Sequence, residues 1–317
     1  MVNNPLVSII IPVYNGSNFL CQAIDSALQQ TYENIEIIVV NDGSKDNDAT
    51  EKIALSYGDK IRYIAKENGG VSSALNTGIK HMNGEYFSWL SHDDMYKPDK
   101  VRLEIEALQK YGDDDSVVLC KSEHINANSV CIQKSSKKSL LSVGKNAWHD
   151  VLKVLFVKGS FNGCAFLIPK KVFDVCGGFD ENLRYSQDAF MWQKMFLRKF
   201  NLIYIDSVCV CNRIHGGQLT QRGRDVFYRD SEYISEIIIP AILQEKDYAE
   251  TFLYAYAKYN AKMNCKNVVD ACLIAAGQER LFGLRQKIRL NILKMYGDIR
   301  PTIRKMYYLL FRRVKTK

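Results

Sequence analysis

The segment VSIIIPVYN, residues Val7–Asn15, decides the fold class of this 317-residue chain. Its first seven residues form a short apolar run rich in β-branched side chains, which is typical of a strand covered on both faces. A second such run, IEIIVV at Ile35–Val40, follows a stretch in which apolar residues recur at helical spacing. Two buried strands joined by a helix predict a parallel α/β sheet that begins near the N-terminus.

The same alternation continues to about residue 111. The pattern predicts helices at 19–28, Asp46–Tyr57 and Ser72–Met82, strands at Ile61–Ala65 and Tyr86–Leu90, and a helix that Pro98 opens and that reaches about Tyr111. Farther on we expect strands at Val117–Cys120, Phe166–Pro169 and Leu202–Ile205, and helices around Lys171–Cys176 and Asp188–Phe200. These elements predict a mostly parallel, Rossmann-like sheet flanked by helices in a domain of residues 1–224, followed by a helical, basic C-terminal region at 225–317.

The composition is that of a soluble globular protein, with 47% hydrophobic and 25% charged residues. No run of 18 apolar residues occurs, so we expect no membrane-spanning helix. The N-terminus has no basic segment ahead of its apolar run, which argues against a cleaved signal peptide. The nine cysteines are odd in number and unpatterned, which favours reduced thiols and a cytoplasmic location.

The positive charge is concentrated at the C-terminus. Residues 285–317 carry eleven basic residues and one acid, a net charge of +10, against +8 for the whole chain, so the preceding residues sum to −2. A near-neutral body argues against a uniformly basic nucleic-acid binder, and we expect no nucleic-acid partner. The basic segment also holds apolar residues. Two interpretations remain open: an amphipathic helix on the inner face of the membrane, or a subdomain packed on the catalytic body.

Polar residues collect where the first four predicted strands end. These loops are Tyr14-Asn15, Asn41-Asp42-Gly43-Ser44, Lys66-Glu67-Asn68-Gly69-Gly70 and Ser91-His92-Asp93-Asp94. Ligands of open α/β sheets bind beyond the carboxyl ends of the strands, so this edge is the predicted binding site. Asp93 and Asp94 form an adjacent acidic pair suited to Mg²⁺ or Mn²⁺, although a solvated loop or a helix cap has the same composition.

Three further side chains are candidates, each with a simpler alternative. Asp42 either accepts hydrogen bonds from a base or ribose or caps the following helix. Asp188 stands at a predicted helix start beside aromatic residues, as a general base or as an N-cap. His215 and its neighbour Arg213 follow a strand-like segment, where they can meet metal and phosphate or serve as ordinary structural residues.

Taken together, these motifs resemble the GT-A-fold glycosyltransferases of family 2 over about residues 5–220. The motifs of the first half, in order, are VSIIIPVYN at Val7–Asn15, Asn41-Asp42-Gly43-Ser44, ENGGVSSALNTGI at Glu67–Ile79, Gly84-Glu85-Tyr86 and WLSHDD at Trp89–Asp94. Those of the second half are Gly177-Gly178-Phe179-Asp180-Glu181, Gln187-Asp188 and Arg213-Ile214-His215.

The resemblance implies a role for each matching position. Donor binding is implied for Pro12, Val13, Tyr14, Asp42, Asn68, Asn76, Asp93 and Arg213. Metal binding of Mn²⁺ or Mg²⁺ is implied for Asp93, Asp94 and His215, with Asp94 as the more direct ligand, and Asp188 matches the catalytic base of inverting members.

Three positions depart from the family pattern. Ser91 takes the place of the first acid in a DxDD motif, so metal binding rests on Asp93 and Asp94. Leu75 takes the place of a frequent arginine, which removes a cation expected near the nucleotide. Gln187 replaces a frequent glutamate and removes a negative neighbour that would raise the pKa of Asp188.

The resemblance therefore implies an enzyme that transfers a sugar from a nucleotide-diphosphate donor, with UDP as the expected nucleotide, to a hydroxyl of a glycan or lipid-linked glycan. Inversion at the anomeric carbon and a part in cell-surface polysaccharide synthesis are implied as well. Two alternatives stay open: a nucleotidyltransferase, against which the turn Tyr14-Asn15-Gly16-Ser17 lacks a cation, and a non-catalytic nucleotide-sugar-binding scaffold.

Overall fold

The computed structural model describes residues 4–112, 115–133, 139–216 and 224–295. The chain divides into two compact units. The first lies within residues 1–151 and 160–223, and the second within residues 152–159 and 224–317. The long helix α5 (Trp148–Lys158) therefore belongs partly to each.

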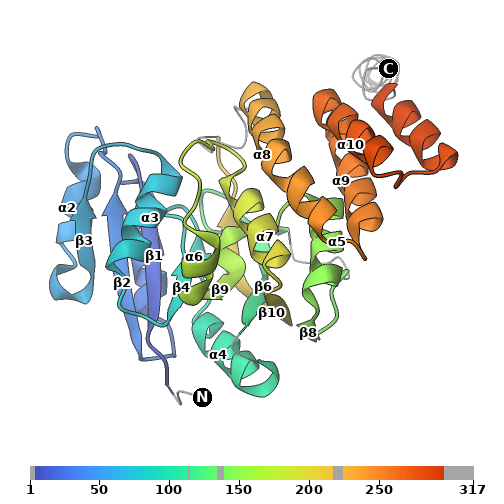
Figure 1. Ribbon diagram of the computed structural model, residues 1–317. Coiled ribbons are helices and arrows are strands. Elements are labelled where there is room, and N and C mark those ends of the chain that lie inside the picture. The colour runs from blue at the N-terminus through green and yellow to red at the C-terminus, as the bar shows by residue number, and fades with distance from the viewer. Residues whose placement is uncertain (1–3, 113–114, 134–138, 217–223, 296–317) are drawn as a thin grey trace, which may run out of the picture. The chain divides into compact units, whose positions relative to one another are not determined.

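Four parallel strands begin the sheet of the first unit (Figure 1). They are β1 (Val7–Val13), β2 (Ile35–Asn41), β3 (Arg62–Ala65) and β4 (Tyr86–Trp89), in the order β3-β2-β1-β4. All seven residues of β1 are buried, as expected for a strand with neighbours on both edges and helices on both faces. The strands predicted from the apolar runs are confirmed to within one residue at each end.

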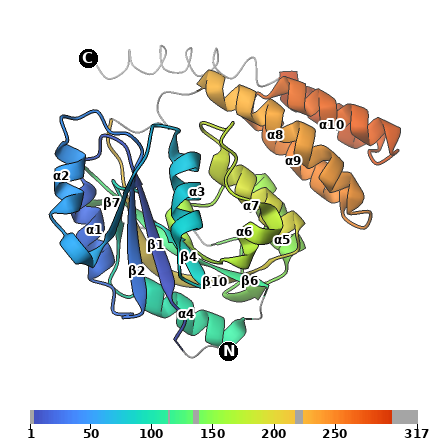
Figure 2. The same cartoon turned by 60° about the vertical axis from the view of Figure 1, so that its left-hand side comes forward.

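Helices cover both faces of these four strands. They are α1 (Leu20–Leu28), α2 (Ala49–Leu55) and α3 (Val71–His81), with a short 3₁₀ turn at Gly58–Lys60. Figure 2 shows α1 and α2 on one side of β1 and β2 and α3 on the other, as right-handed crossovers require. The helix α3 lies very close to β1, because a Cβ atom on Gly78 would come within 2.4 Å of Ile10.

The rest of the sheet is mixed, in the order β4-β9-β6-β10-β5. Its strands are β5 (Met95–Tyr96), β6 (Ser116–Ile125), β9 (Phe166–Pro169) and β10 (Asn201–Arg213), with β7 (Cys131–Gln133) on β6 and β8 (Gly144–Asn146) on β10. The remaining helices of the unit are α4 (Lys100–Tyr111), α6 (Lys171–Cys176) and α7 (Gln187–Leu197), and a 3₁₀ turn spans Gly163–Ala165.

Two features of this second half differ from the sequence-based expectation. The strand β9 runs antiparallel to both β4 and β6, so only part of the sheet is parallel. The strand β10 is 13 residues long, far longer than the predicted Leu202–Ile205, and it pairs in parallel with β6 through a bulge. Polar residues interrupt the apolar pattern after Ile205, so the local sequence does not predict a strand there. The long pairing with β6 stabilises the strand conformation in its place.

The second unit is helical, as predicted, over its described residues. It contains α8 (Arg224–Gln244), α9 (Ala249–Met263), α10 (Lys266–Gln278) and a further helix at 284–295. Aromatic rings form part of its core, with Phe156 5.1 Å from Tyr256 and 6.2 Å from Phe252 between ring centroids. Most of the basic segment, residues 296–317, lies outside the described residues. No helix in the described part of the chain is both long and apolar enough to cross a membrane.

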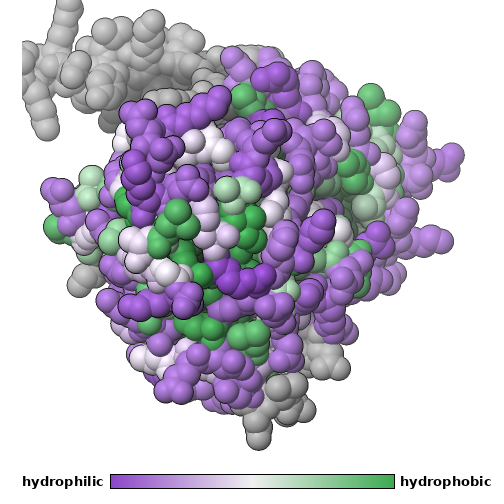
Figure 3. Space-filling view, turned by 90° about the vertical axis from the view of Figure 1, so that its left-hand side faces the viewer, coloured by the Kyte–Doolittle hydropathy of each residue, from purple (hydrophilic) through white to green (hydrophobic). Residues whose placement is uncertain are grey.

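All nine cysteines are free thiols, as expected, and five of them are buried. The face of the molecule at the β3 edge is largely hydrophilic, with apolar residues in smaller areas nearer its middle (Figure 3). On the edge strand itself, Arg62 forms an ion pair of 2.8 Å with Glu36. Charged side chains on an edge strand oppose pairing with another chain.

Candidate active site

The acidic pair lies in a turn between β4 and β5. The amide of Asp94 donates to the carbonyl of Ser91 over 3.1 Å, which closes the turn. The short strand β5 pairs antiparallel with β10, with Met95 opposite Cys211, and this pairing brings the turn beside the end of β10. Residues more than a hundred positions apart in sequence therefore meet at the carboxyl end of β4.

The carboxylate of Asp94 faces the protein interior and is only 6% exposed. One of its oxygens accepts from the amide of Arg213 over 2.8 Å. The other accepts from the side chain of Asn212 over 2.9 Å and from the thiol of Cys164 over 3.4 Å. Burial raises the pKa of Asp94 to about 7, and the charge of Asp93 adds to this effect. Both oxygens of Asp94 are thus held by protein donors.

The side chains of Asp93 and His215 converge. Oδ2 of Asp93 lies 3.0 Å from Nε2 of His215, and Phe19 contacts the imidazole with 5.1 Å between ring centroids. A carboxylate oxygen suits both Mn²⁺ and Mg²⁺, whereas an imidazole nitrogen suits a transition-metal ion such as Mn²⁺ better than Mg²⁺. Asp93 and His215 thus face each other, whereas both oxygens of Asp94 accept from protein donors, and the metal-binding roles of all three residues stay predictions.

This pair suits a metal ion that is shared with a substrate. Among the described residues, no three histidine, cysteine, aspartate or glutamate side chains cluster closely enough to hold a metal ion by themselves. Mg²⁺ is commonly held by one or two carboxylates together with substrate phosphates. The residues present fit such an ion only when a diphosphate completes the coordination.

Arg213 is buried in this structure and bonded to protein acceptors, so its expected contact with phosphate stays a prediction that would need these bonds to open. Its side chain is 0% exposed, and its guanidinium lies 4.4 Å from the ring centroid of Phe19. The guanidinium donates over 2.7–3.1 Å to the carbonyls of Asp93, Asn126 and Ala127 and to the side chains of Gln22 and Ser129. A buried guanidinium needs such partners, and these acceptors leave the side chain no surface for a ligand.

Asp42 follows β2 and organises the loop that leads into α3. It is 3% exposed, and its amide donates to Val13 over 2.8 Å. Its carboxylate accepts from Nζ of Lys66 over 2.8 Å and from the amides of Gly69 and Gly70 over 2.9 and 2.7 Å. Lys66 was not predicted to have a role in the site, although it stands in one of the polar loops that follow the strands, and this position could have identified it.

The other positions expected to bind the donor lie around this loop. Pro12 and Val13 are buried in β1, while Tyr14 is 44% exposed just beyond it. The side-chain amide of Asn68 donates to the carbonyl of Asp42 over 2.8 Å. Donor contacts by these residues remain predictions.

Asn76 connects α3 to a distant loop. Its Oδ1 accepts from the amide of Phe179 over 2.8 Å, and its Nδ2 donates to the carbonyl of Phe179 and to Glu181. A Cβ atom on Gly178 would come within 2.4 Å of this amide, so the contact requires glycine there. Asn76 joins the two halves of the motif set, and its predicted contact with the donor would need these hydrogen bonds to open.

Asp188 lies in the first turn of α7, where a negative charge is favoured by the helix dipole. Its Oδ2 accepts from the hydroxyl of Ser160 over 3.1 Å, and its Oδ1 accepts from the amide of Ala189. Burial raises the pKa of Asp188 to about 6. A carboxyl group with this pKa is ionised near neutral pH and is a stronger proton acceptor than an exposed aspartate.

One short segment connects the two acidic centres. Ser160 contacts Asp188, and Cys164, four residues later, contacts Asp94. Four residues of extended chain span at most about 14 Å, so the two carboxylates belong to one region of the first unit. Sequence reasoning missed this segment, because neither a lone serine nor a lone cysteine carries a recognisable signal.

The chain is similar to glycosyltransferases in sequence and in fold. Glycosyl transferase family 2 matches residues 8–168. An uncharacterized glycosyltransferase of Rickettsia prowazekii is 42% identical, over 96% of this chain and 96% of its own length. Chondroitin synthase of Pasteurella multocida is 29% identical over 70% of this chain, and the match spans 22% of that synthase.

A solved structure shares the fold. The crystal structure of S. aureus TarS in complex with UDP-GlcNAc matches with a TM-score of 0.66, over 94% of this chain and 92% of that one, at 15% sequence identity. This likeness supports the GT-A-type architecture expected from the motifs.

Proposed function

Because the chain belongs to glycosyl transferase family 2 and is a glycosyltransferase, we propose that it moves a sugar from a UDP-linked donor to a hydroxyl of a glycan or lipid-linked glycan, with inversion. The nucleotide is supported by the fold shared with TarS, which was crystallised with UDP-GlcNAc. A glycan acceptor and a part in cell-surface polysaccharide synthesis are supported by the similarity to chondroitin synthase. The nucleotidyltransferase and scaffold alternatives have no comparable support.

A single observation carries the proposed mechanism: the segment from Ser160 to Cys164 contacts both Asp188, a half-buried carboxylate of raised pKa, and Asp94, the neighbour of Asp93 in the acidic turn. Asp93 and His215 supply the metal-suited centre and Asp188 the general base. Transfer of a sugar needs both functions, one at the leaving diphosphate and one at the attacking hydroxyl.

In the proposed step, Asp188 accepts the proton of the acceptor hydroxyl. At the same time, the oxygen of that hydroxyl bonds to the anomeric carbon. The bond between that carbon and the diphosphate oxygen breaks at the same time, and the nucleoside diphosphate leaves with the electron pair. Attack from the face opposite the leaving group inverts the anomeric configuration. A Mn²⁺ or Mg²⁺ ion held by Asp93 and His215 would stabilise the charge on the leaving diphosphate. General-base assistance contributes on the order of 10²–10⁴-fold.

The direct test is a panel of nucleotide-sugars. We expect a UDP-sugar with Mn²⁺ to raise the melting temperature and to be turned over, because a ligand that binds only the folded state stabilises it by mass action. Asp188→Asn should bind the same donor but turn it over about 10²–10⁴-fold more slowly. Retention of configuration in the product, or full turnover by this variant, contradicts the single displacement.

We also propose that the second unit contacts an anionic membrane surface from the cytoplasmic side. The helix at 284–295 has four apolar side chains that are 50–74% exposed: Leu284, Ile288, Ile292 and Met295. Their spacing puts them on one face of the helix, and the exposed Arg285 and Arg289 lie next to them. Basic amphipathic helices bind anionic lipid in this way, with about 1 kcal/mol from each basic residue near the surface.

Vesicle sedimentation tests this contact. The full chain should pellet with phosphatidylserine-containing vesicles and much less with neutral phosphatidylcholine vesicles. Ile288→Ser with Ile292→Ser should reduce pelleting, whereas Ile274→Ser, at a position 63% exposed on α10, should not. Equal pelleting of all three proteins contradicts the proposal.

A further inference from the structure

A fully buried ion pair lies within α4. Nζ of Lys100 and Oε2 of Glu104 are 2.8 Å apart, and both side chains are 0% exposed. Taking two charges out of water costs several kcal/mol per ion, and replacing such a pair by apolar residues is often neutral or stabilising. The pair therefore calls for an explanation beyond stability, and its contacts supply one.

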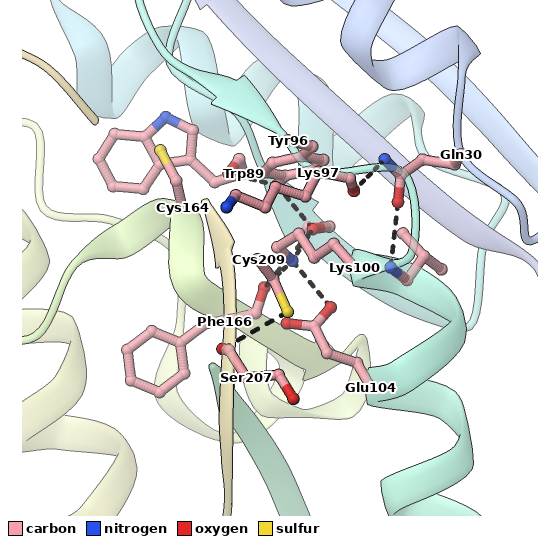
Figure 4. A network of polar contacts seen from close by, with 12 residues as sticks. Gln30, Trp89, Tyr96, Lys97, Lys100, Glu104, Cys164, Phe166, Ser207 and Cys209 are labelled. Atoms are coloured by element: carbon pink, nitrogen blue, oxygen red, sulfur yellow. Dashed lines mark hydrogen bonds and ion pairs between the residues drawn. The ribbon is translucent and has the colours of Figure 1, made fainter. Parts of the chain in front are cut away.

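The ammonium of Lys100 joins three separate strands (Figure 4). It donates to the hydroxyl of Ser88 in β4 over 3.0 Å and to the carbonyl of Phe166 in β9 over 3.4 Å. It also lies 4.4 Å from the ring centroid of Tyr96 in β5. Glu104 balances the charge, so the ammonium stays in this buried position.

Each of these strands leads directly to the acidic site. Trp89 ends β4, and its carbonyl accepts from the hydroxyl of Tyr96 in β5 over 2.6 Å, which closes the loop that carries Asp93 and Asp94. In the other direction, Phe166 lies two residues after Cys164, the thiol that contacts Asp94.

We propose that the Lys100–Glu104 pair positions the acidic turn: one buried ammonium holds β4, β5 and the start of β9 together and so sets where Asp93 and Asp94 lie. An apolar pair of similar volume would fill the same space without hydrogen-bonding Ser88 or Phe166. Such a replacement should keep the fold and loosen the turn. The functional consequence rests on the metal-dependent transfer proposed above.

The structure offers a matched control on the same helix. Arg102 and Glu106 form a second ion pair with the same four-residue spacing, at 2.7 Å, with side chains 39% and 54% exposed. The experiment compares Lys100→Met/Glu104→Met with Arg102→Met/Glu106→Met and with the unmodified chain. Three quantities are measured: the melting temperature, the affinity for Mn²⁺ in the presence of UDP by electron paramagnetic resonance, and amide hydrogen exchange at residues 91–96 and 213.

The buried double variant should keep its melting temperature but bind Mn²⁺ with UDP at least about tenfold more weakly, the size typical of lost support behind a metal ligand. Its amides at 91–96 and 213 should exchange faster. The control variant should change none of the three quantities. Unchanged exchange at these amides in a folded buried variant overturns the proposal.

A second variant covers the case in which the double variant does not fold. Tyr96→Phe removes only the hydroxyl that bonds to Trp89 and Ser88, and it should weaken Mn²⁺ binding and speed exchange at 91–96. Unchanged exchange there overturns the proposal as well. An unmodified chain that binds neither Mn²⁺ nor UDP contradicts the proposed function instead, while the exchange data still decide the positioning role.

Discussion

The hydroxyl of Ser160 donates to the carboxylate of Asp188 over 3.1 Å. The two residues lie 28 positions apart, and their contact fixes the orientation of an acid whose pKa burial raises to about 6. A half-buried carboxylate with a raised pKa and a defined orientation is the expected form of a general base. Several testable consequences start from this contact and from its counterparts around Asp94.

The rate of transfer should fall as the pH drops through about 6, because only the ionised form of Asp188 accepts a proton. Asp188→Asn should lower kcat by about 10²–10⁴-fold. A pH–rate profile of kcat checks the pH dependence, and steady-state kinetics check the loss of kcat in the variant. A profile that is flat between pH 5 and 7, with chemistry limiting, contradicts the assignment.

Asp188→Asn should also stabilise the protein. The folded-state pKa of Asp188 lies above its unfolded value, so the folded state is favoured by protonation, and this contribution is lost as the pH rises through about 6. At pH 7.5 an uncharged asparagine avoids burying a charge and should raise the melting temperature by about 2–4 °C for each kcal/mol gained. At pH 4.5 the difference between the two proteins should be smaller. Thermal melts at both pH values test the sign.

His215→Gln should weaken the binding of the metal without weakening the fold. Removal of metal with EDTA should abolish transfer in the unmodified chain, and Mn²⁺ should restore it, because the leaving diphosphate needs charge stabilisation. In the variant, the Mn²⁺ concentration for half-maximal activity should rise at least about tenfold. His81→Gln, at an exposed histidine on α3, is the control. An unaltered Mn²⁺ requirement would remove His215 from the site.

Arg213→Met should destabilise the protein by about 3–5 kcal/mol, as expected when one partner is removed from a buried charged network. Its guanidinium serves five acceptors, which methionine leaves unpaired. Arg213→Lys should rescue little, since an ammonium lacks the planar fork. Urea denaturation measures the free energy of unfolding of this variant and of Arg102→Met, a control at a more exposed arginine. A stable variant with a raised KM for the donor would instead support a phosphate contact.

Gly70→Ala should weaken donor binding. Gly70 has φ +88°, and an added Cβ atom would come within 2.4 Å of the guanidinium of Arg184. Its amide also donates to Asp42 over 2.7 Å. Such backbone conformations cost other residues about 1–3 kcal/mol. Gly58→Ala is the matched control, because Gly58 has φ +54° with open space around it. Calorimetric titration with UDP should separate the two variants, and equal affinities contradict a role for this loop in binding.

The local sequence pattern was sufficient to predict the elements whose formation depends little on tertiary contacts. The apolar runs of β1 and β2 predict their own burial, and Pro98 marks the start of the helix that becomes α4. The site was predicted through the rule for parallel strands, which places Asp42 and the Asp93–Asp94 pair at one edge of the sheet. Asp188 was identified as a candidate because it stands at a helix start within a recognisable motif, and the structure confirms the helix start.

What local pattern does not contain is the direction in which a polar side chain points. Arg213 and Asp94 both lie in predicted site segments, yet the first is buried against backbone carbonyls and the second against Asn212 and Cys164. These contacts join residues 70–120 positions apart. A polar group can face substrate or satisfy another buried group, and only the positions of its partners decide between the two.

The amino-acid order alone was thus enough for the four parallel strands β3-β2-β1-β4, the polar edge at their carboxyl ends and the family, because hydrophobic period and motif spacing are properties of neighbouring residues. Tertiary structure decided which protein groups hold the carboxylate of Asp94, where the guanidinium of Arg213 lies, and how Ser160 and Cys164 join the two acidic centres. The reason is physical: hydrogen bonds and burial depend on distances in space, and strands β4, β5, β9 and β10 acquire those distances only when the sheet is assembled.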